Sequence, residues 1–143
     1  MRDGANVPIV LDVSATMSWL VDDERDRLAI EMAETILNEG AIVPVLWRWE
    51  LRNALLVAER RGRISATIVQ ELLSDVAGMP IRIDLRGSEM YDESDLTLAR
   101  RYSLSIYDAA YLDLASRSGF PLMTRDLQLA NAAKDLALRW QPS

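Results

Sequence analysis

The sequence contains no cysteine and no histidine among its 143 residues. Without cysteine, the chain can form neither disulfide bonds nor thiolate metal sites. Without histidine, it cannot use an imidazole general base, a Ser-His-Asp or Cys-His triad, or histidine-bound zinc. Lys134 is the only lysine, so the basic residues are almost all arginines. Any chemistry of this chain must therefore rely on carboxylates, hydroxyl groups or arginine.

Long apolar runs are also missing, although half of the residues are apolar. No uninterrupted run approaches the roughly 20 residues that a membrane-spanning helix needs. The first residues, MRDGANVPIV, do not resemble a secretory signal, and we therefore expect a cytoplasmic protein that does not enter a membrane. The length fits one domain with a real core, which we predict over residues 7–143 after a tail at 1–6.

Short apolar runs alternate with amphipathic helical patterns along the chain. This alternation predicts an α/β fold, with a central parallel sheet of four or five short strands and helices on both faces. The predicted strands are 9–11, 41–45, 81–85 and 120–124, with 136–140 as an optional fifth. The predicted helices are a short one ending near 19, followed by 22–39, 46–61, 66–77, 88–102, 105–115 and 126–136.

Four acidic residues lie where the ligands of such a fold gather, beyond the carboxyl ends of the strands. Asp12 directly follows one predicted strand, and Asp126 follows another. Glu50 and Asp108 lie in the first turns of predicted helices, on faces that are otherwise apolar. We therefore expect these four acids, from distant parts of the chain, to converge on one pocket.

Four carboxylates in one pocket repel one another, and their pKa values rise. A divalent cation resolves this conflict, and Mg²⁺ or Mn²⁺ suits it because hard ions prefer oxygen ligands. The formal net charge of −6 would argue against a nucleic-acid partner. That argument fails if several of the acids are gathered at one metal site.

Taken singly, most of these acids have ordinary structural explanations. Ser105 and Asp108 fit a capping box, Asp126 can serve as a plain N-cap, and Glu50 can pair with an arginine along its helix. Asp12 is the hardest to explain in this way, since a carboxylate that closes a buried strand has few backbone groups to bond. The metal hypothesis therefore rests on the four acids together.

Asp113 provides a contrast within the same predicted helix. It lies four residues before Arg117 on the polar side of the helix. This spacing is typical of a salt bridge along one helix face. We expect an ordinary pair on the surface.

Four segments, VLDVSA, WELRNAL, YDAAYLDLA and TRDLQLA, resemble in order and spacing the signatures of the PIN-domain ribonucleases. The likeness is greatest to the small VapC-type toxins of toxin–antitoxin pairs, and it extends from about Val7 to the C-terminus. It implies hydrolysis of RNA phosphodiester bonds with Mg²⁺ or Mn²⁺ at the four acids. It also adds three flanking residues to the site, namely Ser14, Asn53 and Thr124.

The resemblance also implies partners: an RNA substrate, a homodimer and a cognate VapB-type antitoxin whose C-terminal segment blocks the acidic pocket. Trp19, Trp47 and Trp49 are candidates for the antitoxin contact, although Trp47 is better explained as a core residue. Arginines on and after the Glu50 helix could bind RNA, with a solvated helix face as the alternative. They are Arg48, Arg52, Arg60, Arg61 and Arg63.

Two other classes of function fit the sequence poorly. A signalling receiver domain needs a lysine after a late strand, but Lys134 lies inside the last predicted helix. A phosphotransferase with an aspartyl nucleophile needs a second acid two positions after Asp12, where this chain has Ser14. The serious alternative to a ribonuclease is a PIN-like module that binds RNA or protein without cleavage.

Overall fold

The computed structural model describes residues 7–86 and 92–143. Within them, four short parallel strands form a sheet in the order β3-β2-β1-β4. The predicted α/β class with a central parallel sheet is therefore confirmed. The strands are β1 (Ile9–Leu11), β2 (Ala41–Pro44), β3 (Ile81–Asp84) and β4 (Leu122–Met123).

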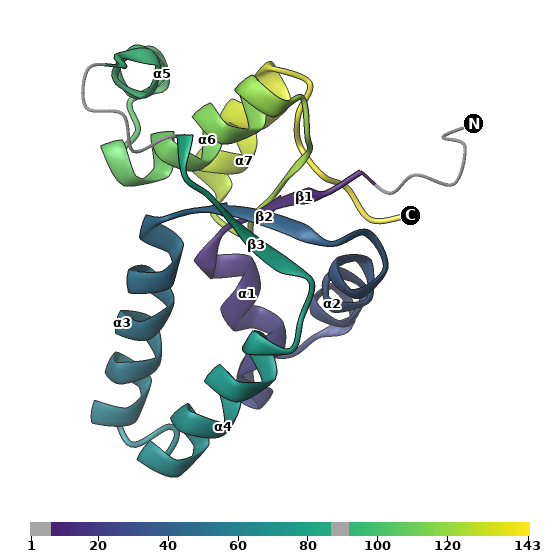
Figure 1. The fold of residues 1–143 in the computed structure, drawn as a ribbon, viewed down its shortest axis with the longest axis vertical. Coiled ribbons are helices and arrows are strands. Elements are labelled where there is room, and N and C mark those ends of the chain that lie inside the picture. Colours follow the sequence, from purple (N-terminus) through teal and green to yellow (C-terminus); the bar gives the residue numbers. More distant parts are fainter. Residues whose placement is uncertain (1–6, 87–91) are drawn as a thin grey trace.

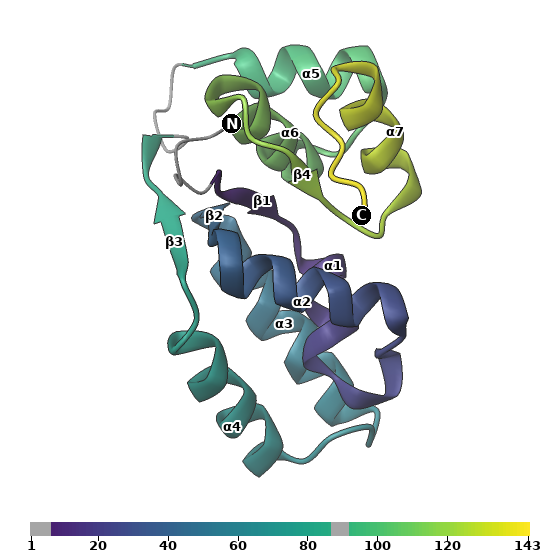
Figure 2. The ribbon, with the colours of Figure 1, turned by 90° about the vertical axis from the view of Figure 1, so that its right-hand side faces the viewer.

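Helices cover both faces of this sheet (Figure 1). They are α1 (Val13–Leu20), the 3₁₀ turn η1 (Asp22–Glu24), α2 (Arg27–Glu39), α3 (Leu46–Arg60), α4 (Ala66–Ala77), α5 (Ser94–Tyr102), α6 (Ile106–Ser118) and α7 (Leu127–Asp135). Helices α5, α6 and α7 lie on one face, with α1, α2 and α3 on the other (Figure 2). None of the helices in the described ranges combines the length and the hydrophobicity needed to cross a membrane.

The single helix predicted over 22–39 is divided into η1 and α2. The division follows from Asp26, whose carboxylate accepts the backbone N–H of Ala29 at 2.8 Å and so caps α2. An acidic N-cap satisfies amides that the first turn leaves free, which stabilises a new helix start at this point. Arg125 binds the same carboxylate through two hydrogen bonds of 2.8 and 2.9 Å.

The C-terminal strands are shorter than predicted. The strand expected at 120–124 is reduced to the two residues of β4. The optional fifth strand at 136–140 is present only as an isolated parallel bridge between Leu122 and Arg139. The backbone N–H of Trp140 nevertheless donates to the carbonyl of Leu122 at 2.9 Å, so this segment continues the sheet by one step.

Two predicted segments fall outside the described residues. They are the tail at 1–6 and the first positions, 88–91, of the helix predicted over 88–102. The later part of that helix is present as α5.

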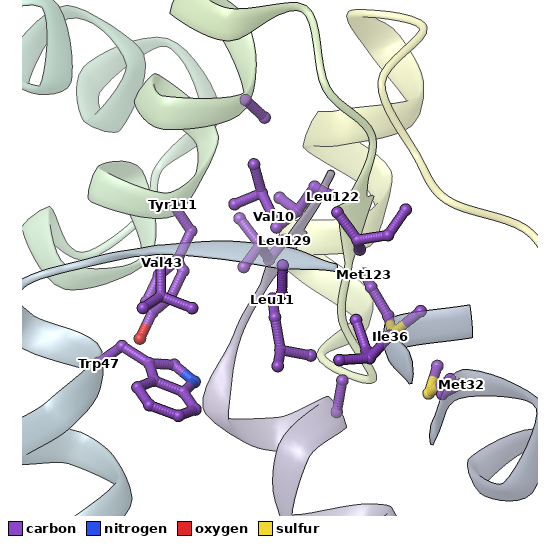
Figure 3. Close-up of a cluster of buried hydrophobic side chains, with 14 of the residues drawn as sticks. Val10, Leu11, Met32, Ile36, Val43, Trp47, Tyr111, Leu122, Met123 and Leu129 are labelled. Atoms are coloured by element: carbon purple, nitrogen blue, oxygen red, sulfur yellow. The ribbon is translucent and has the colours of Figure 1, made fainter. Parts of the chain in front are cut away.

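The core is built around β1, which lies between β2 and β4 and is buried at every position. A strand covered on both faces must be apolar throughout, which explains why its sequence does not alternate. Figure 3 shows the surrounding core side chains, among them Leu129 and Ile36. In the β1–β4 register, Leu11 lies opposite Met123. The carboxyl ends of these two strands therefore meet at Asp12, whose N–H donates to the carbonyl of Met123 at 3.2 Å.

Candidate active site

Asp12 is a buried carboxylate at the meeting point of β1, α1 and β4, and its residue is 5% exposed. It caps α1, because its Oδ1 accepts the backbone N–H of Ala15 at 2.9 Å. The hydroxyl of Ser14 donates to Oδ1 at 2.8 Å, and that of Thr124 donates to Oδ2. Three donors from two distant chain segments therefore hold this carboxylate in place.

Burial is the largest influence on Asp12, and it raises the pKa of this carboxyl group to about 6. The hydrogen bonds from Thr124, Ala15 and Ser14 lower the pKa, but they only partly offset the loss of hydration. The charge of Asp108 raises the pKa further. Without a cation, Asp12 is therefore under electrostatic strain when it is ionised.

Glu50 lies near the start of α3, where its side chain is half-buried. The hydroxyl of Tyr111, on α6, donates to Glu50 Oε1 at 2.6 Å. Burial raises the pKa of Glu50, the bond from Tyr111 lowers it, and the charge of Asp108 raises it again. The sequence places Tyr111 on the apolar face that Asp108 shares, but it does not reveal this bond.

Asp108 lies in the first turn of α6, and Ser105 is the N-cap of that helix. The Oγ of Ser105 accepts the backbone N–H of Asp108 at 3.1 Å, so the predicted cap at Ser105 is present. The pKa of Asp108 is raised by burial and then by the charge of Asp126, while the hydrogen bond with Ser105 lowers it. The cap thus orders the helix end but leaves the carboxylate facing other acids.

Asp126 is an exposed residue with a clear structural role as the N-cap of α7. Its Oδ1 accepts the backbone N–H of Leu129 at 2.8 Å. Its own N–H donates to the hydroxyl of Thr124 at 3.0 Å, which ties it to the residue that also binds Asp12. The N-cap explanation is therefore confirmed, and the charge of Asp126 also acts on Asp108.

Asp108 is the acid with which the other three candidate acids interact electrostatically. Asp12, Glu50 and Asp126 each interact with its charge. None of the four forms a salt bridge with another described residue. Across residues 7–86 and 92–143, no three acids lie close enough to form a ready-made metal cage. Direct ligation of a metal by all four therefore stays a prediction.

The predicted flanking residues differ in their positions. Ser14 and Thr124 both contact Asp12, and their hydroxyl oxygens lie 3.2 Å apart. The Oγ of Ser14 also accepts the backbone N–H of Arg125 at 2.9 Å. Asn53 is exposed on α3, one turn after Glu50. Contacts of these side chains with substrate or metal stay predictions.

The arginines proposed for RNA are mostly at the surface. Arg48 is exposed, and its guanidinium carbon lies 4.6 Å from the centre of the Trp49 ring. Arg52 is partly buried, while Arg60 and Arg61 are exposed. Arg63 forms an ion pair with Asp23 at 2.7 Å. The structure therefore leaves the RNA-binding role of these arginines as a prediction.

Of the three tryptophans proposed for the antitoxin contact, two are buried. Trp47 is 5% exposed and donates its indole N–H to Thr16 Oγ1 at 3.2 Å, which agrees with the core alternative. Trp19 is 4% exposed, so little of its ring is at the surface, and its contact with an antitoxin stays a prediction. Trp49 is 63% exposed and keeps its ring available to a partner.

The prediction of a surface pair at Asp113 is correct in its partner and wrong in its location. Arg117 binds Asp113 at 2.9 Å, but Asp113 is only 6% exposed. The same guanidinium group binds Asp84, at the end of β3, at 3.0 Å. Because α6 packs against the sheet, this side of the helix is covered, and two acids share one arginine there.

Comparison with known proteins agrees with this fold. The sequence model of the PIN domain matches residues 9–135. The chain therefore belongs to the PIN-domain family, which confirms the resemblance seen in its four signatures.

Two proteins from Pyrobaculum aerophilum are similar to this chain, one in sequence and one in fold. Ribonuclease VapC3 is 27% identical over 124 residues, which cover 85% of this chain and 92% of that protein. The crystal structure of PAE2754 matches with a TM-score of 0.62 at 22% sequence identity. That match covers 89% of this chain and 86% of the other, and it concerns the fold.

Proposed function

We propose that this chain is a metal-dependent ribonuclease that hydrolyses phosphodiester bonds of RNA, and that it is the toxin of a VapBC-type toxin–antitoxin pair. The observation that carries the proposal is the group of acids around Asp108, which lack a basic partner among the described residues; the charge of Asp108 raises the pKa values of Asp12 and Glu50, and that of Asp126 raises the pKa of Asp108. Membership of the PIN-domain family and the likeness to a protein named Ribonuclease VapC3 support the same function.

The donor set fits Mg²⁺ or Mn²⁺, because these hard ions bind carboxylate oxygens and keep several water ligands. Asp12, Glu50 and Asp108 would hold the ion directly or through water, with Asp126 joining them from the exposed edge. When bound, such an ion activates a water molecule and neutralises charge that develops on the phosphate. Partial hydration would also account for acids that lie too far apart to enclose a bare ion.

Other residues of the chain would prepare the site and receive the substrate. Ser14 and Thr124 fix the orientation of the Asp12 carboxylate through their hydroxyl groups. Arg48 and Arg52, close to Glu50 on α3, would bind RNA phosphates, for which the planar guanidinium group is well suited. Arg63 would have to leave its pair with Asp23 in order to do so.

The test of this function is cleavage of an RNA pool by the purified protein in EDTA, in Mg²⁺ and in Mn²⁺. We expect cleavage that requires the metal and falls to background in Asp12→Asn and in Asp108→Asn. Mn²⁺ should also raise the melting temperature, because an ion that binds only the folded state stabilises it. Thermal unfolding of both variants checks that each of them is folded.

The alternative of a non-catalytic PIN-like module has one observation in its favour, which is the spacing of the acids within the described residues. It predicts that the protein binds RNA without cleaving it, and that Mn²⁺ leaves the melting temperature unchanged. That pair of results would overturn the ribonuclease proposal.

For the antitoxin, a groove of about 860 Å³ bordered by α1, η1, α2 and α4 supports the proposed pairing. Apolar side chains line it, including Ile30, Ile68 and Leu72, together with five acids and two arginines. Trp19 also lines the groove, and its indole nitrogen has no hydrogen-bond partner among the described residues. An antitoxin segment with apolar side chains and basic flanking residues would complement this surface.

We expect Ile68→Glu to weaken binding of the proposed VapB-type antitoxin by at least about tenfold, since it places a charge in an apolar contact. Ile83→Glu is the matched control, because Ile83 is similarly exposed on β3 and does not line the groove. Isothermal titration measures both variants. Equal affinities for the two variants would place the antitoxin elsewhere.

The proposal includes a homodimer in the cytoplasm, where RNA and a nascent antitoxin are available. Light scattering of the purified protein measures the mass in solution directly. A monomer at micromolar concentration would contradict the dimer without affecting the proposed chemistry.

A further inference from the structure

Tyr111 connects two of the acids at the candidate site. It lies on α6 three residues after Asp108, and its residue is 1% exposed. Figure 3 shows its side chain among the core residues, with the hydroxyl oxygen directed toward the start of α3, near Trp47. There it donates to Glu50 Oε1 at 2.6 Å. A single phenol group therefore joins α6, which carries Asp108, to α3, which carries Glu50.

This bond restricts a side chain that has few other restraints. Within residues 7–86 and 92–143, it is the only side-chain hydrogen bond that Glu50 makes. A glutamate has three rotatable side-chain bonds, so a half-buried one without such a bond can occupy several rotamers. The phenol engages Oε1 and leaves Oε2 as the oxygen with full freedom to bind a cation.

We propose that Tyr111 is a positioning residue, which orients Glu50 so that its second oxygen faces the ion held near Asp12 and Asp108. This inference rests on the proposed metal-dependent function. A group that hydrogen-bonds to a metal-ligating side chain restricts the orientation of that side chain. Loss of such a group typically lowers metal affinity by about 10–100-fold. Tyr111 is placed to act in this way, through its bond with Glu50.

Tyr102 offers a matched control within the same chain. Its hydroxyl also donates to a carboxylate, Asp135 Oδ2, at 2.5 Å. That pair joins α5 to α7 at the surface and involves none of the four candidate acids. Tyr102→Phe and Tyr111→Phe therefore remove the same chemical bond, once outside the site and once within it.

The experiment measures Mn²⁺ binding to the folded protein by isothermal titration, and then RNA cleavage as a function of Mn²⁺ concentration. We expect Tyr111→Phe to weaken Mn²⁺ binding by about tenfold. The Mn²⁺ concentration for half-maximal cleavage should rise in proportion, and kcat should largely recover at saturating Mn²⁺. Tyr102→Phe should match the unmodified protein in both measurements.

A second pair of variants separates positioning through Glu50 from a general loosening of the core. In the Glu50→Ala background, the additional change Tyr111→Phe should no longer affect Mn²⁺ affinity, because the residue it acts through is gone. An undiminished tenfold effect in that background would overturn the proposal. All titrations are made below the melting temperature of the least stable variant.

The outcomes distinguish this inference from the proposed function on which it rests. If the unmodified protein binds Mn²⁺ and Tyr111→Phe binds it equally well, the positioning role is overturned while the metal site stands. If the unmodified protein binds no Mn²⁺, the metal-dependent function itself fails, and the positioning role fails with it.

Discussion

Helix α6 carries two aspartates in opposite electrostatic surroundings. Asp113 is buried, yet Arg117 neutralises it and also binds Asp84 from the end of β3. Asp108, five positions earlier, has acids as its charged neighbours and forms no salt bridge with a described residue. Burial alone therefore does not identify a functional acid, since Asp113 is buried and paired with Arg117. A missing counter-charge is the more informative sign.

Acids without a counter-charge destabilise the folded state, and Asp12 gives an estimate of how much. Its pKa rises from 3.8 to about 6. At about 1.4 kcal/mol per pKa unit, ionised Asp12 destabilises the folded state by about 3 kcal/mol relative to an aspartate with an ordinary pKa. No basic side chain in the described residues offsets this cost, whereas Arg117 offsets that of Asp113. A divalent cation would remove the difference between the two regions.

The largest effect should come from a substitution among the acids around Asp108, which lack a basic partner. Asp108→Asn removes the charge that the other three acids share, and we expect RNA cleavage and the Mn²⁺-dependent rise in melting temperature to disappear. Asp113→Asn is the control on the same helix, and per folded molecule it should retain both. Loss of the metal response in Asp113→Asn alone would show that the wrong end of α6 was assigned to the site.

The next largest effect should come from removing Arg117, the counter-charge of Asp84 and Asp113. Arg117→Leu leaves the buried Asp113 and the half-buried Asp84 without a counter-charge, and breaking a buried pair typically costs about 3–5 kcal/mol. We expect this loss in urea unfolding, with Mn²⁺ affinity preserved at a temperature where the variant is folded. A loss below about 1 kcal/mol would mean that water already screens this pair.

The pH dependence of stability should distinguish the same two regions. Because burial raises the pKa of Asp12 to about 6, the folded state holds a proton that the unfolded state releases from about pH 4 upward. In EDTA, this group should therefore destabilise the protein progressively from about pH 4 to pH 6, by about 2 to 3 kcal/mol. Burial raises the pKa values of Glu50 and Asp108 in the same direction.

Urea unfolding as a function of pH measures this dependence. Asp12→Asn should flatten the curve in that window, and Mn²⁺ should reduce the loss of stability there in the unmodified protein, because the cation favours the ionised carboxylate. A curve that instead rises from pH 4 to pH 6 in EDTA would contradict the raised pKa values.

The smallest effect concerns an ion pair at the surface. Arg63 and Asp23 have side chains that are 34% and 53% exposed. Exposed pairs contribute about 0–1 kcal/mol, so Arg63→Ala should change the unfolding free energy by less than about 1 kcal/mol. A larger loss in urea unfolding would show that Arg63 has a structural role comparable with that of Arg117.

Local patterns predicted the elements well and the long-range pairings poorly. Helix α4 has the predicted bounds because Ser65 caps its start and Gly78 follows its end. The start of α2 was missed because Asp26 was assigned to the helix interior instead of its N-cap.

Pairings between distant segments leave no periodic signal in a sequence. Asp113 was assigned to the surface because its spacing to Arg117 is local, whereas its second neighbour, Asp84, comes from another strand. The bond between Tyr111 and Glu50 joins residues 61 positions apart. The four acids were found because each stands at a strand end or helix start, which a sequence does record.

The position of β4 in the sheet also determines when the candidate site forms during protein synthesis. Asp12 is made early, but Thr124, which holds its carboxylate, is made 112 positions later. β1 acquires its second neighbour in the sheet only when β4 is complete. A chain still attached to the ribosome thus contains its first acids long before the strand that orders them. If the proposed ribonuclease function holds, the candidate site of an emerging chain would stay incomplete until Thr124 has been added.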